Sequence, residues 1–280
     1  MLLTECPRDA MQGLTRFVPT DLKIRYLNAL LRVGFDTLDF GSFVSPNAVP
    51  QMADTATVLA GLDLTNTQTN LLAIVANRRG ADEATQHGQI RYIGFPLSVS
   101  ETFQQRNTNK SITQALIEVA EMQNLCVRTG HELVIYLSMG FGNPYGDPYS
   151  PDLVADFTGQ LAGLGIQRVA PSDTVGTATP EAIETLFRHL IKTFPAVSFG
   201  AHLHARPGET PAKIRAALRA GVGRIDGALR GFGGCPMADD HLTGNLPTEE
   251  IIETLRAEGV PVLLNQEAWD EAWRLSAAVF

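Results

Sequence analysis

The sequence predicts a closed (β/α)8 barrel, in which eight parallel strands alternate with helices. Eight short apolar runs alternate along the chain with longer amphipathic stretches, which is the pattern of parallel βα units. The chain has 280 residues, a length at which such barrels often fold as one domain. Polar residues gather directly after the apolar runs, where a barrel carries its chemistry.

The eight expected strands are short and mostly apolar. They are Leu2–Glu5, Thr37–Phe40, Asn70–Val75, Ile90–Phe95, Leu133–Ser138, Arg168–Ala170, Val197–Ala201 and Arg224–Ala228. An open doubly wound sheet also alternates strands with helices, but it usually carries fewer strands. The eightfold count therefore favours the closed barrel.

The expected helices show apolar residues at helical spacing or clear end signals. Pro180 follows Thr179 at a favourable first-turn position, and Gly221 is a good C-terminal stop. The segments are Asp21–Val33, Ser111–Arg128, Pro151–Leu164, Pro180–His189, Thr210–Ala220 and Thr248–Glu258.

The region after Gly259 is harder to assign. The segment VPVLLN is either one more short strand or an added arm, and Trp269 and Trp273, four residues apart, indicate a terminal helix packed on the body. We expect a single catalytic barrel domain over residues 1–280, with about residues 260–280 as a small C-terminal arm or helix.

Composition and charge exclude several classes of protein. Hydrophobic residues make up 44% and charged residues 19%, which is typical of a globular chain. A net charge of -8 argues against binding to nucleic acid or to an anionic membrane. Three cysteines without CxxC spacing argue against a disulfide framework. The first residues lack a basic or long apolar segment, so we expect a cytoplasmic protein without a signal or transit peptide.

The polar residues that follow the strands form one candidate site, because the carboxyl ends of barrel strands meet at one mouth. They are Arg8, Asp9 and Gln12 after the first strand, Asp39 and Ser42 at the second, Asn77 after the third, Ser138 at the fifth, Asp173 and Thr174 after the sixth, His202 and His204 at the seventh, and Cys235 and Asn245 in the loop after the eighth.

The HLH triplet is the sharpest feature of this set. Side chains two apart on a strand point to the same face, so His202 and His204 can ligate one divalent cation. Two such histidines can equally be packing residues, but Asp9 at another strand end adds a hard carboxylate ligand. Nitrogen and oxygen ligands suit Mg, Mn, Fe or Zn, and an amide oxygen from Asn245 favours Mg²⁺ or Mn²⁺.

Two further segments each have a structural and a functional interpretation. Arg8 and Asp9 are either a surface ion pair or a guanidinium fixed beside a metal, where it stabilises an enolate. GFGGCPMADD is either a flexible loop or a mobile lid that brings Cys235 to the substrate as a proton donor or acceptor.

Together, five segments resemble the 3-hydroxy-3-methylglutaryl-CoA lyase family, within a metal-dependent superfamily that also contains isopropylmalate and homocitrate synthases. The resemblance covers roughly Glu5 to Gly259, and the G-G-C-P cysteine loop is typical of the lyase branch rather than the synthases. The segments are CPRDAMQG (family P-R-D-G-L-Q-N), GSFVSPNAVPQMAD (T-S-F-V-S-P-K-W-V-P-Q-M-x-D), SDTVGTATP (G-D-T-I-G-x-x-T-P), AHLHAR (H-x-H) and GFGGCPMADDHLTGNLPTEE (G-L-G-G-C-P…G-N-x-x-T-E-D).

The resemblance implies a role for each matching residue. Arg8 would stabilise the enolate of acetyl-CoA, Cys235 would be the catalytic thiol, and His202 or Asp9 would be the base. Gln12 would contact the substrate. Asp39, Ser42 and Asp173 would position the substrate or the ligands. The implied metal ligands are Asp9, His202, His204 and Asn245.

The resemblance further implies an activity and its partners. The chain would cleave 3-hydroxy-3-methylglutaryl-CoA to acetyl-CoA and acetoacetate, a retro-Claisen reaction of leucine degradation and ketone-body metabolism. We expect a divalent metal, an acyl-CoA substrate and a homodimer, and neither nucleic acid nor a membrane as partner.

Some positions depart from the family's pattern, and other functions stay open. An arginine that the family places two residues before Tyr136 is Val134 here, and Asn143 replaces a cysteine. The alternatives are a related lyase or Claisen-type synthase for a different 3-hydroxyacyl-CoA or 2-keto acid, a barrel that binds without catalysis, and a zinc hydrolase, whose further ligands we do not find at the strand ends.

Overall fold

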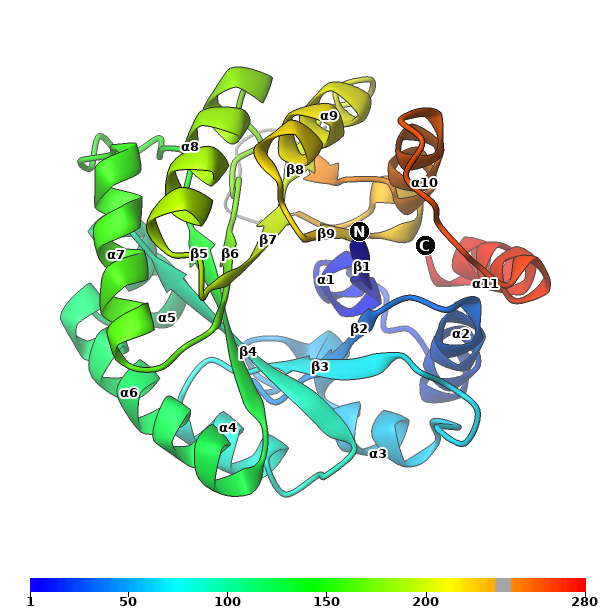
Figure 1. Ribbon diagram of the computed structural model, residues 1–280. Helices are drawn as coiled ribbons and strands as arrows, with labels where there is room; N and C mark the ends of the chain where they lie inside the picture. Colours follow the sequence, from blue (N-terminus) through cyan, green and yellow to red (C-terminus); the bar gives the residue numbers. More distant parts are fainter. Residues whose placement is uncertain (235–242) are drawn as a thin grey trace.

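Eight parallel strands close into a barrel, in a computed structural model that describes residues 1–234 and 243–280 (Figure 1). The strands follow one another around the barrel in chain order, and the last pairs with the first. They are β1 (Leu2–Glu5), β2 (Thr37–Ser42), β3 (Asn70–Ile74), β4 (Ile90–Ser98), β5 (Glu132–Ser138), β6 (Arg168–Pro171), β7 (Ser198–His202) and β9 (Arg224–Gly227). The predicted (β/α)8 barrel is therefore confirmed.

Helices surround the barrel, and α11 lies beside α2 near the N-terminus (Figure 1). Two 3-10 turns, Pro50–Met52 and Leu229–Gly231, add to them. The helices are α1 (Pro7–Gln12), α2 (Thr20–Val33), α3 (Thr55–Ala60), α4 (Arg78–Ala84), α5 (Glu101–Thr108), α6 (Ile112–Thr129), α7 (Pro151–Gly163), α8 (Pro180–Thr193), α9 (Thr210–Ala220), α10 (Thr248–Ala257) and α11 (Gln266–Val279).

The strands are buried on both faces, which explains why they read as continuous apolar runs. Their inward side chains fill the barrel, and a separate apolar layer packs under the helices. In α8 the residues at helical spacing, such as Ile183 and Leu190, face that layer. The inner layer comprises Leu72, Ile74, Tyr92, Val134, Tyr136 and Ala170.

The structure changes several predicted boundaries. β2 continues to Ser42 and β4 to Ser98, while β7 begins at Ser198 and ends at His202. The strand considered for VPVLLN was wrong, because residues 260–265 only connect α10 to α11. The terminal helix around Trp269 and Trp273 is present as α11.

Two short strands form a separate sheet outside the barrel. β8 (His204–Ala205) pairs antiparallel with β10 (Gly244–Asn245), so that His204 lies opposite Asn245. The expectation that one strand carries both histidines was therefore wrong. The chain leaves β7 at His202 and pairs anew at His204, yet the two rings lie 5.3 Å apart between centroids.

Glu5 ties the end of β1 to the segment after β9. Its carboxyl accepts the backbone N–H of Leu229 at 2.8 Å and the hydroxyl of Thr248 at 2.5 Å. Full burial outweighs these hydrogen bonds and raises the pKa of Glu5 to about 8. The first strand is therefore joined to α10 by a carboxyl that stays neutral at pH 7.

Among the described residues, none of the helices has both the length and the apolar character needed to cross a lipid bilayer.

Candidate active site

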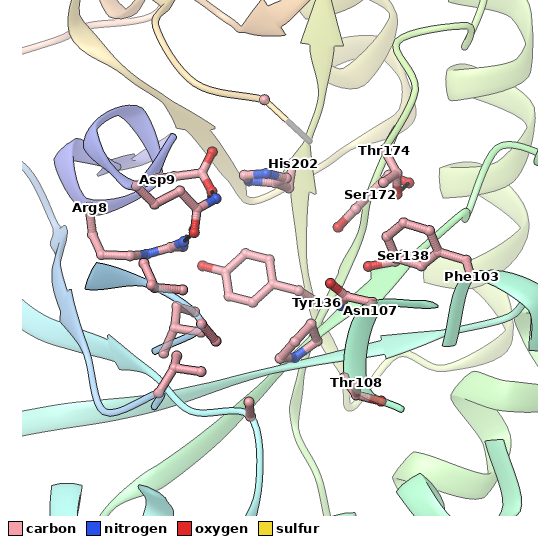
Figure 2. Close-up of a pocket in the computed structure, with 18 of the residues that line it drawn as sticks. Arg8, Asp9, Phe103, Asn107, Thr108, Tyr136, Ser138, Ser172, Thr174 and His202 are labelled. Atoms are coloured by element: carbon pink, nitrogen blue, oxygen red, sulfur yellow. Dashed lines mark hydrogen bonds and ion pairs between the residues drawn. The ribbon is translucent and has the colours of Figure 1, made fainter. Parts of the chain in front are cut away.

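A short helix directly after β1 presents the first two site residues. Pro7 occupies the first turn of α1, and Arg8 and Asp9 follow it, both buried. Figure 2 shows their side chains on one side of a pocket, beside His202 from the end of β7. The barrel thus brings residues almost 200 positions apart in the chain to one mouth, as the strand-end prediction requires.

Arg8 is held between two carboxylates. Its Nε and Nη2 donate to Asp39 at 3.0 and 2.5 Å, and its Nη1 donates to Asp9 at 3.1 Å and to the Gln12 amide oxygen at 2.8 Å. Burial raises the pKa of Asp39 to about 6, although the charge of Arg8 opposes the rise. The predicted ion pair is buried and not on the surface.

Asp9, His202 and His204 converge on one point. Their ligand atoms all lie within 4.8 Å of one another. Burial raises the pKa of Asp9, but the charges of Arg8 and His202 and the hydrogen bond from Asn245 lower it more, so that the net pKa is below its usual value. Asp9 is therefore ionised, which is the form in which a carboxylate binds a divalent cation.

His204 offers a free nitrogen lone pair. Its Nδ1 lies 3.1 Å from the carbonyl of Thr174, which can only accept, so Nδ1 carries the proton. Nε2 is buried and has no hydrogen-bond partner in the described part of the chain. Burial, together with the charge of His202, lowers the pKa of His204 to about 4 and keeps the ring neutral. An orphaned buried nitrogen of this kind fits a metal ligand.

Asn245 completes the set from the opposite strand. Its amide nitrogen donates to Asp9 at 2.7 Å and to the carbonyl of Phe232 at 2.9 Å. Both amide hydrogens are then used, which leaves the oxygen as the acceptor. Asp9, His202 and His204 therefore form a nitrogen-and-oxygen set that fits a divalent cation, and Asn245 contacts this set through Asp9. Cys6, His202 and Asp226 form a second group with metal-ligand spacing, but Arg224 already binds that carboxylate.

Asp226 is a buried acidic residue beside the site that the sequence analysis missed. It lies on β9, is fully buried, and places Oδ2 3.3 Å from Nδ1 of His202. Burial lowers the pKa of His202, but the hydrogen bond and charge of Asp226 raise it more, so the net pKa is above its usual value. An acidic residue inside a strand of otherwise buried residues was the available signal.

The pocket in front of these residues is a cavity of about 360 Å³ with a mixed lining. Apolar side chains such as Val49, Pro96 and Phe103 line it together with the hydroxyl-bearing Ser138, Ser172 and Thr174. Figure 2 shows Phe103 beside Ser138, and Tyr136 pointing toward Arg8 and Asp9. Ser172, Phe103 and Tyr136 were also missed. Ser172 directly follows β6, so its strand-end position was an available signal, whereas Phe103 lies on α5 and Tyr136 lies within β5.

Five predicted residues in the described part of the chain do not line this pocket. Two of them, Asp39 and Asn245, contact the lining residues Arg8 and Asp9, and the other three are Ser42, Asn77 and Asp173. The Ser42 hydroxyl accepts from the backbone of Val44, and the Asn77 side chain caps α4 at Gly80. Asp173 accepts from buried Lys213 at 2.9 Å. These side chains hold loops at the mouth. Predicted Cys235 lies outside the described residues, and Gly234, its neighbour, lines the pocket.

Comparison with known proteins agrees with this architecture. The HMGL-like family model matches residues 2–275. The chain is 33% identical to the cytoplasmic 3-hydroxy-3-methylglutaryl-CoA lyase of Rattus norvegicus, over 91% of this chain and 73% of that protein. It is also 33% identical to a hydroxymethylglutaryl-CoA lyase of Bacillus subtilis, over 89% of this chain and 82% of the relative.

Solved structures give the same result. An HMG-CoA lyase from Brucella melitensis has a TM-score of 0.91 and 30% identity, with 99% of this chain and 98% of that chain covered. An HMG-CoA lyase from Acinetobacter baumannii, in complex with coenzyme A and 3-methylmalate, has a TM-score of 0.90 and 27% identity, with 99% and 90% covered. The chain therefore belongs to the HMGL-like family, and it is a lyase.

Proposed function

We propose that the chain cleaves 3-hydroxy-3-methylglutaryl-CoA to acetyl-CoA and acetoacetate, with Mg²⁺ or Mn²⁺ bound by Asp9, His202, His204 and Asn245. The observation that carries the proposal is the meeting of Asp9, His202 and His204 beside the buried guanidinium of Arg8. The names of the relatives support the substrate. A divalent cation bound there supplies Lewis acidity toward the oxygens of such a substrate.

Asp9 is the base of the two residues considered. The reaction begins with removal of the proton from the C3 hydroxyl. His202 would ligate the cation through Nε2, and its Nδ1–H faces Asp226, so neither ring nitrogen can accept that proton. Asp9 is ionised beside Arg8, and we assign the proton transfer to its carboxylate.

The electron pair of the broken C2–C3 bond needs an acceptor site. It passes into the thioester of acetyl-CoA as an enolate, while the C3 oxygen becomes the ketone of acetoacetate. Arg8 uses four of its five N–H donors on Asp39, Asp9 and Gln12, which leaves one Nη2 hydrogen without a partner among the described residues. That donor stabilises the enolate oxygen. Cys235 then gives a proton to C2, which completes acetyl-CoA.

A different short acyl-CoA is the second candidate substrate. Ser172 lines the pocket at the position where the family's G-D-T motif has glycine, so its side chain takes space from the acyl group. The Acinetobacter relative is described in complex with coenzyme A and 3-methylmalate, a smaller acid than 3-hydroxy-3-methylglutarate. These observations favour a smaller or more polar 3-hydroxyacyl group.

The test is release of acetyl-CoA from 3-hydroxy-3-methylglutaryl-CoA after chelator treatment and after addition of Mg²⁺ or Mn²⁺. We expect turnover only in the metal-loaded protein. A parallel set of 3-hydroxyacyl-CoA esters with shorter acyl groups identifies the preferred substrate. A Ser172→Gly variant should shift preference toward the larger ester if Ser172 limits the pocket. No cleavage of any ester by metal-loaded protein would refute the proposal, and condensation of acetyl-CoA with a keto acid would favour a synthase.

A further inference from the structure

An arginine lies inside the barrel below the pocket. Arg224 begins β9 and is only 5% exposed. Gly200 on β7 is its register partner, and a Cβ at Gly200 would lie 2.5 to 2.7 Å from the guanidinium. The guanidinium therefore occupies the space of the missing side chain. Val134, where the family's pattern has an arginine, is fully buried and carries no charge.

The contacts of Arg224 lead to the site. Its Nε donates to Oδ1 of Asp226 at 3.0 Å, and Oδ2 of the same carboxylate lies 3.3 Å from Nδ1 of His202. Nη2 of Arg224 is buried without a hydrogen-bond partner in the part of the chain that is described. The three side chains thus form a line from the barrel interior to the ring that faces Asp9.

We propose that Arg224 is a positioning residue that fixes the Asp226 carboxylate, so that Asp226 holds the His202 ring with Nδ1–H inward and Nε2 free toward the pocket. A carboxylate beside His202 alone can rotate and shift. With Oδ1 held by the guanidinium of Arg224, only Oδ2 is free to accept from the ring. Outer-shell partners of this kind set the tautomer and orientation of ligating histidines.

The inference rests on the proposed metal site, but it makes a separate statement about the ring. Arg224 touches neither substrate nor metal in this scheme, so its effect must pass through Asp226. A purely structural ion pair would stabilise the barrel without changing the state of His202. A conservative Arg224→Lys variant keeps the charge but loses the planar fork, so it should restore the effect only in part.

The experiment compares Arg224→Met, Arg224→Lys, Asp226→Asn and the double variant Arg224→Met/Asp226→Asn. Arg168→Met is the matched control, because Arg168 pairs with Glu132 at 2.6 Å on a neighbouring strand, at the end of the barrel away from the pocket. Calorimetric titration of metal-free protein with Mn²⁺ gives the affinity, and ¹⁵N NMR of the histidine rings in metal-free protein gives the tautomer of His202.

We expect Arg224→Met to weaken Mn²⁺ binding by about 10–100-fold and to change the His202 ring pattern, while Arg168→Met changes neither. The double variant should bind no more weakly than Asp226→Asn, because Arg224 acts only through that carboxylate. The Mn²⁺ affinity of Arg224→Lys should lie between those of the wild-type protein and Arg224→Met. If Arg224→Met does not fold, Arg224→Lys tests the inference in its place.

The inference would be overturned if folded Arg224→Met or Arg224→Lys bound Mn²⁺ as tightly as the wild-type protein and gave the same ¹⁵N signals for the His202 ring. If the wild-type protein binds no Mn²⁺, the proposed metal site is refuted. The ¹⁵N signals of the His202 ring in the metal-free proteins then still test the role of Arg224. A change in these signals upon Arg224→Met then supports the inference alone, and no change refutes it.

Discussion

Replacing Arg8 by glutamine should destabilise the transition state and so lower kcat. The wild-type guanidinium donates two hydrogen bonds to Asp39 and one each to Asp9 and Gln12, and keeps one Nη2 hydrogen for the substrate. Loss of one oxyanion donor costs about 2.7–4 kcal/mol, or about 10²–10³-fold in kcat. KM should change much less, since the interaction forms mainly in the transition state.

We expect the Arg8→Gln variant to fold, because buried Asp39 can become neutral when Arg8 is absent. With Arg8 present the pKa of Asp39 is already about 6, and Arg8 is the charge that lowers it. Without Arg8 that pKa should rise, so that Asp39 takes up a proton at neutral pH and leaves no unpaired buried charge. Arg8→Lys keeps a charge near Asp9 but loses the fork, so it should restore kcat only in part.

The assay is steady-state cleavage at saturating Mn²⁺, with a melting curve for each variant. Arg168→Gln serves as the control, because it removes a comparable arginine–carboxylate pair away from the pocket. A near-normal kcat in a less stable Arg8→Gln protein would refute the catalytic role and leave Arg8 as a support for the α1 turn.

Three further outcomes follow from the site. His204→Ala should lose most of its bound metal in elemental analysis, because it removes the orphaned Nε2, whereas His87→Ala should not; equal metal in both would exclude His204 as a ligand. Cys235→Ser should keep metal and substrate binding while kcat falls by about 10²–10⁴-fold, and wild-type turnover would exclude the thiol as proton donor. Because the pKa of Glu5 is raised from 4.5 to about 8, the folded protein keeps a proton that the unfolded chain releases above about pH 4.5. Between about pH 4.5 and pH 8 the free energy of unfolding of the wild-type protein should therefore fall by up to about 1.4 kcal/mol per pH unit. Glu5→Gln should lack this slope in denaturant titrations, and parallel pH profiles for both proteins would contradict the assigned pKa.

The barrel itself could be predicted because its strands are buried on both faces and its helices carry clear end signals. The short helix α1 could not, since PRDAMQ has no apolar face long enough to show periodicity. The break between His202 and His204 was missed for a related reason. A two-residue strand such as β8 is defined by its partner β10, and that pairing joins segments forty residues apart.

The proposed ligands Asp9, His202, His204 and Asn245 were chosen by strand-end position and residue type. Position at a strand end could not separate these from Ser42 or Asn77, whose side chains satisfy nearby backbone groups instead. Residues that act from within a strand, such as Asp226, stay hidden, because inward and outward positions cannot be told apart before the register is known.

The pairing of Gly200 with Arg224 constrains how this barrel can change. An alanine at position 200 would place its methyl group within 2.7 Å of a guanidinium that Asp226 already holds in place. Any side chain larger than hydrogen at position 200 would therefore force the guanidinium to move, and the Asp226 carboxylate that it binds would have to move with it. A glycine that touches neither the pocket nor the proposed ligands thus sets the geometry of a carboxylate at the site.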